Sequence, residues 1–208
     1  MSDTPLLLKI VLMGPPILFS IILHEIAHGW VANRLGDDTA ARAGRLTLNP
    51  LPHIDPIGSV VLPLLLLVSG SNYLFGWAKP VPVRFGHLRN PKRDMVAVAL
   101  AGPGTNVVLA VLFAIAAHWF GGMQMRTPMI MALVGVQINV VLAVFNLLPI
   151  LPLDGGRVLF GLLPMPAAVA FSRLEPYGLL IVMALLFTGV LGTVLGPVTR
   201  ALVGVLLA

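Results

Sequence analysis

The residues of this sequence best suited to chemistry are His24, Glu25 and His28, which form the run His-Glu-Ile-Ala-His. An α-helix turns about 100° per residue, so positions i and i+4 lie on one face. Both imidazoles can therefore reach one metal ion, and the neighbouring Glu25 carboxylate can handle a proton. The spacing predicts zinc chemistry.

This run lies within a long apolar stretch, residues 6–35. The HExxH pattern has only three fixed letters, so it also occurs by chance on ordinary helices. In hydrocarbon, however, unpaired ionisable side chains are costly and usually mark function. We therefore favour a metal site over two accidental polar residues.

The composition places this site in a membrane. Of 208 residues, 58% are hydrophobic and 10% are charged, whereas a soluble domain carries about 25% charged residues. The net charge of +5 is not accompanied by a basic, aromatic-interleaved patch, so we expect no nucleic-acid partner. Cysteine is absent, so any zinc ligands must be histidines and carboxylates.

A catalytic zinc ion needs three protein ligands and one open position. A third histidine six residues after His28 would complete one known zinc pattern, but Arg34 stands there. The second glutamate of the chain is Glu175, which lies far along the sequence. Asp154 lies among apolar residues, after two prolines and before two glycines that allow close backbone approach. We favour Asp154 as the third ligand, the alternative being an N-cap of a helix that begins near Arg157.

The other polar residues have simpler interpretations. Asp37 and Asp38 follow the first apolar stretch and are predicted to be exposed end-of-helix charges. Asn106 and Asn139 lie within predicted spans, where hydrogen bonds between helices are common. Asn106 is equally compatible with lining the site, and Asn139 shares a face with Asn146.

Three features together resemble the site-2 protease family of intramembrane zinc metalloproteases. They are HEIAH in a span, the pattern N-x-x-P-x-x-x-x-D-G-G from Asn146, and the run Ala-Gly-Pro-Gly-Thr-Asn at residues 101–106. The resemblance implies that His24, His28 and Asp154 hold one Zn²⁺ per chain and that Glu25 is the general base. It also implies that Asn146 orients substrate or stabilises the oxyanion. The chain resembles a compact form without a PDZ or CBS domain.

We therefore expect an intramembrane zinc metalloendopeptidase. Its partners would be the lipid bilayer and a transmembrane protein substrate, cut within or next to its membrane segment. The alternative is a membrane metal-ion transporter or carrier, because intramembrane histidine and aspartate also mark ion pathways. Glu25 separates the two hypotheses, since a protease needs it for turnover and not for metal binding.

The elements that must position these residues are predicted to be membrane helices. We expect an all-α polytopic membrane protein with about five or six membrane helices, forming a single domain over residues 1–208. Gly14, Pro15 and Pro16 should break or kink the first helix. The remaining helices are predicted at residues 17–35, 95–120, 128–148, 174–191 and 194–207, with a short helix from Arg157.

The region between the first two long spans is predicted to differ. Residues 57–68 are too short for a full span and suggest a re-entrant or interfacial segment. Short β-strands are expected within residues 40–90, at 42–50 and 81–85. Residues 45–48 are our candidate for pairing with an unwound substrate segment.

A re-entrant segment also settles the expected orientation. If residues 57–68 crossed the membrane completely, Asp154 would lie at the membrane face opposite the one at which the HExxH helix ends. Without that crossing, most cations lie on one side, which the positive-inside rule makes cytoplasmic. We expect an integral protein of a bacterial cell membrane whose active site opens toward the cytoplasm. The cations on that side are Arg34, Arg42, Arg45, Lys79, Arg84, Arg89, Lys92, Arg93, Arg157 and Arg173, with Lys9 and Arg126 toward the other.

Overall fold

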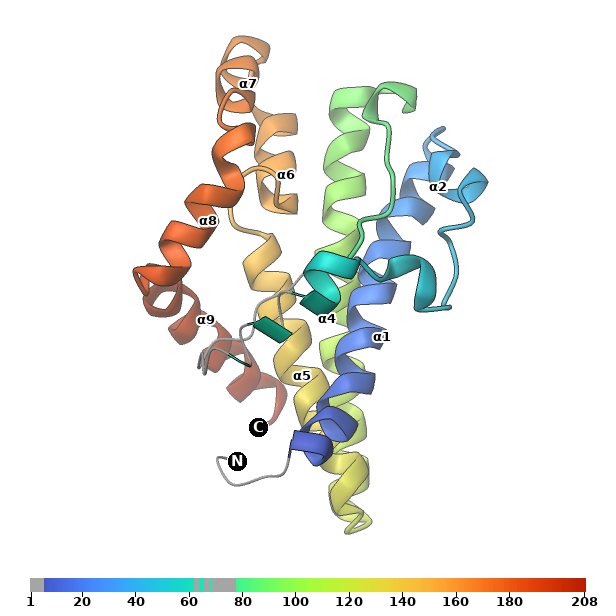
Figure 1. The fold of residues 1–208 in the computed structure, drawn as a ribbon, viewed down its shortest axis with the longest axis vertical. Helices are drawn as coiled ribbons and strands as arrows, with labels where there is room; N and C mark the ends of the chain where they lie inside the picture. Colours follow the sequence, from blue (N-terminus) through green and yellow to red (C-terminus); the bar gives the residue numbers. More distant parts are fainter. Residues whose placement is uncertain (1–5, 62–63, 66–67, 69–77) are drawn as a thin grey trace.

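The computed structural model describes residues 6–61, 64–65, 68 and 78–208 (Figure 1). Four helices within these residues are long and apolar enough to cross a membrane, which makes the chain an integral membrane protein. A fifth apolar helix is shorter. The four candidate spans are Ile10–Arg34, Pro91–Gly122, Arg126–Asn146 and Met165–Phe187, and the shorter helix is Val190–Leu206.

Three long helices form the centre of the protein: α1 (Leu6–Arg34), α4 (Pro91–Gly122) and α5 (Arg126–Asn146). Figure 1 shows α1 and α5 running in one direction and α4 in the other. The contact between α4 and α5 is formed by small and β-branched side chains, which allow helices to approach closely. The buried cluster at this contact is Ala110, Ala114, Val136 and Val140.

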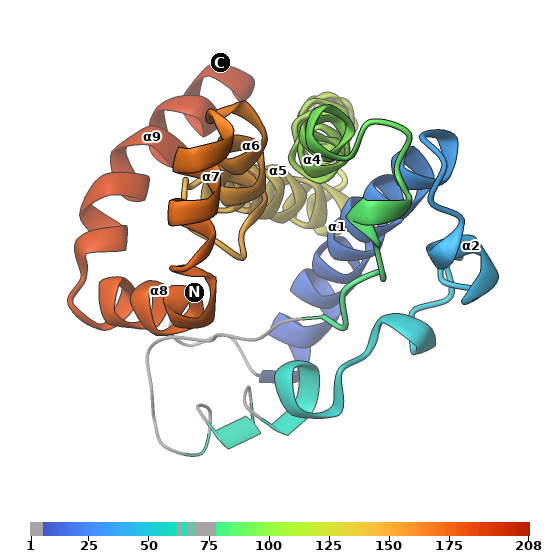
Figure 2. The ribbon, with the colours of Figure 1, turned by 90° about the horizontal axis from the view of Figure 1, so that it is seen from above.

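The C-terminal part of the chain continues from the end of α5. It contains α6 (Asp154–Leu162), α7 (Met165–Ser172), α8 (Gly178–Phe187) and α9 (Val190–Leu206). Helix α6 packs against α4, and the Nζ of Lys92 donates a hydrogen bond to the carbonyl oxygen of Leu163. Figure 2 shows α8 and α9 on the opposite side of the bundle from α1.

The connection between α1 and α4 begins and ends at the same end of the bundle. The backbone N–H of Arg89 donates a hydrogen bond of 3.0 Å to the carbonyl oxygen of Leu35. This connection therefore makes no net crossing of the membrane. It includes α2 (Thr39–Arg42) and a π-helix at Pro56–Val61. Within the predicted re-entrant segment, residues 62–63 and 66–67 lie outside the described residues.

The predicted β-strands are wrong: the described residues contain no β-strand, and residues 42–50 and 81–85 are turns, extended segments and short helices. Residues 78–84 have no regular secondary structure, and two prolines in them, Pro80 and Pro82, remove N–H groups that a ladder requires. The N–H of Val81 is used by the Glu25 side chain instead. A strand also needs a neighbouring strand to pair with, and the described residues contain none.

Some predicted helix boundaries need correction. About five or six membrane helices were expected, including the re-entrant segment near residues 57–68, and the described residues contain four candidate spans and one shorter apolar helix. Helix α1 runs unbroken through Pro15 and Pro16. The span predicted at 174–191 ends at Phe187, because Gly189 adopts a left-handed conformation with φ of 77° before α9 begins.

Asp37 follows α1 and forms a hydrogen bond to the segment at residues 78–84. It was predicted to be exposed, and this prediction is wrong. Its side chain is buried and accepts hydrogen bonds from the backbone N–H of Arg84 (2.6 Å) and from the N–H and hydroxyl of Thr39. Burial by itself would raise the pKa of Asp37. The hydrogen bonds from Thr39 and Arg84, with the nearby His87, outweigh burial and hold the pKa below its ordinary value.

Replacing Asp37 with Asn is expected to lower the free energy of unfolding at pH 7 by about 1.5–3 kcal/mol, because a charged acceptor is lost. Because the pKa of Asp37 in the folded protein lies below its ordinary value, the ionised side chain stabilises the fold at pH values above that ordinary value. This stabilisation is lost as the pH falls toward the pKa of the folded protein. The difference from wild type should therefore shrink below about pH 4. Thermal unfolding in detergent at both pH values measures this effect.

The neighbouring substitution Asp38→Asn is the control. Asp38 is exposed and forms a 2.6 Å ion pair with Arg42, which is itself exposed. Its loss should change stability by less than about 1 kcal/mol. Equal effects of the two substitutions would contradict the anchoring role of Asp37.

Candidate metal centre

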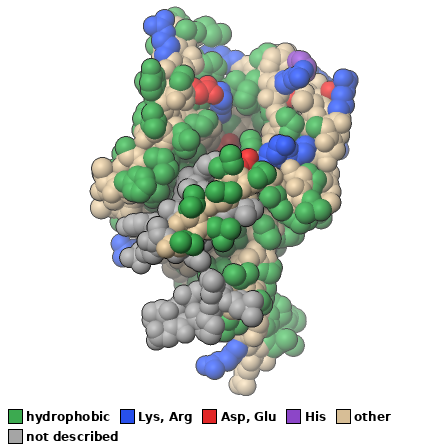
Figure 3. Space-filling model, viewed as in Figure 1, with side chains coloured by type: hydrophobic (Ala, Val, Ile, Leu, Met, Phe, Trp, Pro, Cys, Tyr) green, Lys and Arg blue, Asp and Glu red, His purple; other side chains and the backbone are tan. Residues whose placement is uncertain are grey.

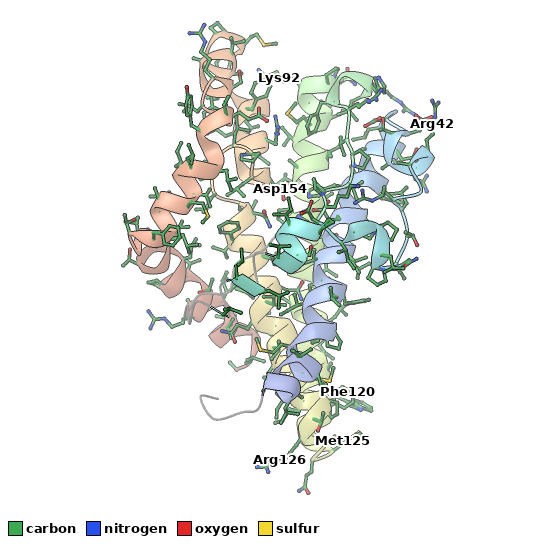
Figure 4. The ribbon with its side chains drawn as sticks, in the orientation of Figure 1. Arg42, Lys92, Phe120, Met125, Arg126 and Asp154 are labelled. Atoms are coloured by element: carbon green, nitrogen blue, oxygen red, sulfur yellow. The ribbon has the colours of Figure 1, made fainter. Side chains whose placement is uncertain are left out.

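Three potential metal ligands converge from two helices that are far apart in sequence. His24 and His28 lie one turn apart on α1, and Asp154 is the first residue of α6. Asp154 Oδ2 is 3.3 Å from His24 Nε2, Asp154 Oδ1 is 3.3 Å from His28 Nε2, and the two Nε2 atoms are 3.1 Å apart. This is the single group of potential ligands found in the described part of the chain. Figure 4 places Asp154 between the two ends of the bundle.

The hydrogen bonds behind the two imidazoles determine which nitrogen faces the site. His28 Nδ1 donates to the carbonyl oxygen of Val98 at 2.7 Å, since a carbonyl can only accept. His24 Nδ1 lies 2.6 Å from Asn106 Oδ1, while the Asn106 amide nitrogen donates to Asn139. Both Nδ1 atoms therefore carry the proton, and both Nε2 lone pairs point toward Asp154.

Three acceptors thus converge with no donor between them. Asp154 Oδ2 is buried and has no hydrogen-bond partner, an arrangement that is unfavourable unless a cation occupies the space. Tetrahedral zinc with bonds of about 2.0–2.1 Å would separate its ligand atoms by about 3.3–3.4 Å. The observed separations of 3.1–3.3 Å fit this geometry. Two imidazoles and one carboxylate are also a donor set that zinc accepts, with one position left open.

Gly102 on α4 forms a wall of the site beside the metal-facing atoms of the two imidazoles. A Cβ atom at this position would lie 2.3 Å from His28 Nε2 and 2.6 Å from His24 Cε1. Only a glycine lets α4 approach the histidines this closely. The Ala-Gly-Pro-Gly-Thr-Asn run signalled this contact, although the sequence did not indicate which glycine makes it.

The two glycines after Asp154 serve a similar purpose. A Cβ at Gly155 would lie 2.2 Å from the carbonyl oxygen of Leu147, and one at Gly156 would lie 2.5 Å from the carbonyl carbon of Ile150. The first turn of α6 is therefore folded tightly against the preceding loop. This helix begins at Asp154 and not near Arg157, and no side-chain capping hydrogen bond is recorded for it, which disfavours the N-cap alternative.

A chain of buried polar side chains supports His24 from behind. Asn106 Nδ2 donates to Asn139 Oδ1 at 2.8 Å, Asn139 Nδ2 donates to Ser20 Oγ at 2.7 Å, and Ser20 Oγ donates to the carbonyl of Pro16 at 2.7 Å. Asn106, Asn139 and Ser20 are fully buried. The two asparagines were recognised as candidates for such contacts, whereas Ser20 was missed because a single serine on a helix carries no distinguishing signal.

Replacing Asn106 with Leu is expected to weaken zinc binding by about 10- to 100-fold, the usual effect of losing a hydrogen-bond partner behind a metal ligand. The substitution removes the group that holds the His24 tautomer. Competition with a fluorescent zinc chelator measures the affinity. Gln137→Leu is the control, because Gln137 is an exposed polar residue of α5 outside this chain; a comparable loss there would contradict the assignment.

The two remaining predicted site residues have different surroundings. Glu25 follows His24 on α1, and its Oε2 accepts a 2.7 Å hydrogen bond from the backbone N–H of Val81. The Asn146 amide nitrogen donates to the carbonyl of Leu142 on its own helix at 3.0 Å. The structure records no contact between Asn146 and the three converging ligands, so its catalytic role remains a prediction.

Comparison with known proteins identifies relatives of this chain. The model of the family described as Peptidase family M50 matches residues 122–189, which include Asp154 but not the HEIAH run. YwhC of Bacillus subtilis, named as a candidate zinc metalloprotease, is 38% identical over 89% of this chain and 84% of its own length. Rip2 of Mycolicibacterium smegmatis, named in the same way, is 35% identical over 82% of this chain and 64% of its own length. No solved structure matches significantly.

Proposed function

This chain belongs to peptidase family M50, the site-2 protease family of intramembrane zinc metalloproteases, and from that premise we propose which residues do the chemistry. His24, His28 and Asp154 hold one zinc ion per chain, and Glu25 is the general base. Asn146 assists at the oxyanion. The observation that supports this assignment is the convergence of three acceptor atoms, with no donor between them, next to Glu25. Residues 1–208 form one membrane-embedded protease domain.

The reaction follows from the positions of these side chains. A zinc ion held by these residues would polarise the scissile carbonyl and lower the pKa of a water molecule to about 7. Glu25 takes a proton from the attacking water and passes it to the leaving amine. The Asn146 amide can donate a hydrogen bond to the oxygen that becomes negative in the transition state.

The substrate is a transmembrane segment of a membrane protein. The potential ligands lie on and beside helices that are apolar enough to span the bilayer, and His24 and His28 are buried between α1 and α4. A helical substrate hides its carbonyls in its own hydrogen bonds, so it must unwind before cleavage. Residues 45–48 are not a strand in the structure, so we do not propose that they pair with an unwound substrate segment. The family membership also removes the transporter alternative.

Purified protein tests this function directly. Wild type should bind one zinc ion per chain and cleave a model transmembrane peptide, lose cleavage after chelation, and regain it when zinc is returned. Asp154→Ala should lose both zinc and cleavage. Zinc-loaded wild type that leaves a panel of transmembrane peptides intact would refute the assignment.

We infer the orientation of the site from the distribution of cations. Figure 3 shows most Lys and Arg side chains toward one end of the molecule, and Figure 4 places Arg42 and Lys92 at that end and Arg126 at the other. In a bacterial cell membrane the cationic end faces the cytoplasm, so the site opens toward it.

Cysteine labelling tests this orientation without background, because the chain has no natural cysteine. Arg84 and Arg126 are both exposed. In intact cells, a membrane-impermeant thiol reagent should label Arg126→Cys and should reach Arg84→Cys only after lysis. Equal labelling of both would contradict the orientation.

A further inference from the structure

The Pro80–Val81 peptide group lies between two charged side chains. One is the buried guanidinium of Arg45, and the other is the half-buried carboxylate of Glu25, the proposed base. The backbone N–H of Val81 donates to Glu25 Oε2 at 2.7 Å. The carbonyl of the same peptide group, that of Pro80, accepts a hydrogen bond from Arg45 Nη2 at 3.3 Å. Arg45 Nη2 also donates to the carbonyl of Lys79 at 2.7 Å. The guanidinium and the carboxylate thus bind opposite ends of the Pro80–Val81 peptide group.

This arrangement is electrostatically favourable. The cation of Arg45 faces the negative end of the peptide dipole, and the anion of Glu25 faces the positive end. Hydrogen bonds to ionised groups are stronger than neutral ones, and bonds in a chain polarise each other at low dielectric. Arg45 is buried, so solvent screens this chain little.

The sequence around Val81 restricts this peptide group to one role. Pro80 and Pro82 have no N–H, so Val81 offers the single backbone donor of these three residues. Pro82 also biases Val81 toward an extended conformation. The Val81 side chain is buried against α1, where a Cβ at Gly29 would lie 2.8 Å from Val81 Cγ1.

Residues 78–84 are also held near both ends by backbone hydrogen bonds. Lys79 N–H donates to the carbonyl of His53 at 2.9 Å, and Arg84 N–H donates to Asp37 Oδ2 at 2.6 Å. Within the described residues, the Val81 bond is the single hydrogen bond recorded for the Glu25 carboxylate. Oε2 is therefore fixed, and Oε1 carries the remaining acceptor capacity.

We propose that the Pro80–Val81 peptide group, held by Arg45, positions the Glu25 carboxylate for proton transfer. The recorded hydrogen bonds of Val81 and Arg45 reach Glu25 and the Lys79 and Pro80 carbonyls and none of the three metal ligands, so they are positioning residues that act through Glu25. This inference rests on the proposed function, in which Glu25 is the general base. It predicts a loss of turnover with unchanged metal content.

Val81→Pro removes the N–H donor, and Val81→Ala keeps it while shortening the side chain, so the pair isolates the hydrogen bond. A hydrogen bond to a charged group is worth enough that its loss should lower kcat by about 10- to 100-fold. KM for a model transmembrane peptide and the zinc content should stay at the wild-type values. Val81→Ala should retain most of the wild-type kcat.

Arg45 gives a second test that leaves the backbone unaltered. Arg45→Met should lower kcat by a similar factor, and Arg45→Lys should restore part of it, because lysine can donate to one carbonyl. The double variant Val81→Pro with Arg45→Met should lose no more than Val81→Pro alone, since both act through one peptide group.

Three results would overturn the inference. An unchanged kcat in Val81→Pro and Arg45→Met would show that the contact does not matter. A raised kcat would show that the contact is inhibitory. Loss of zinc in both variants would show a structural role. Wild type and Glu25→Gln are assayed alongside: if wild type does not cleave, the proposed function fails, whereas a failure confined to the Val81 and Arg45 variants concerns this inference alone.

Discussion

Replacing Glu25 with Gln is expected to leave one zinc ion bound per chain while peptide cleavage falls by about 10²- to 10⁴-fold, the usual contribution of general acid–base catalysis. Glutamine has the same shape and can still accept the hydrogen bond from the Val81 N–H. It cannot take a proton from water at neutral pH. Zinc content by atomic absorption and cleavage of a labelled transmembrane peptide give the two readouts.

Glu175→Gln is the matched control. Glu175 forms an ion pair with Arg157, has no recorded hydrogen bond to the three converging ligands, and is the other glutamate of the chain. Its replacement should leave both zinc content and cleavage close to wild type. Cleavage that survives Glu25→Gln, or zinc that disappears with it, would contradict the role of Glu25 as the base.

Replacing Gly102 with Ala is expected to weaken zinc binding by more than about 100-fold, beyond the usual effect of disturbing a group behind the ligands. The added Cβ would overlap His28 Nε2, a proposed ligand atom, at 2.3 Å. Backbone on a packed helix yields little, so the histidines must move away from Asp154. Cleavage should fall in proportion to the zinc that is lost.

Gly104 provides a control on the same helix. A Cβ at Gly104 would have no atom within 4 Å, and alanine is a better helix former than glycine. Gly104→Ala should therefore bind zinc as wild type does. Full zinc occupancy in Gly102→Ala at limiting zinc would show that the site tolerates the displacement, contrary to this account.

The buried polar chain connects the geometry of the site to the packing of the three central helices. Ser20 belongs to α1, Asn106 to α4 and Asn139 to α5, and each donates or accepts within the chain that ends at His24. In an apolar bundle, such side chains find few other partners. A shift of any one helix would break a hydrogen bond and release the His24 ring.

The error over the β-strands has a clear physical origin. Sequence patterns report the local preference of a segment, and the prolines at positions 80 and 82 favour extended backbone in the residues before them. A strand also needs a neighbour in register, which local preference does not specify. Here two of the backbone donors bind carboxylates, Val81 to Glu25 and Arg84 to Asp37, and the Lys79 N–H donates to the carbonyl of His53.

The sequence by itself determined the membrane class, the protease family and the set of residues proposed to do the chemistry. These depend on composition and on short spacings, such as the four-position step from His24 to His28, which a helix places on one face. The tertiary structure decided how those residues are held. Three contacts join segments that are distant in sequence. They are Gly102 against the imidazoles, the hydrogen-bond chain from Asn106 to Ser20, and the Pro80–Val81 peptide group between Arg45 and Glu25. Such contacts depend on how each helix is rotated and packed against the others, which no local pattern encodes.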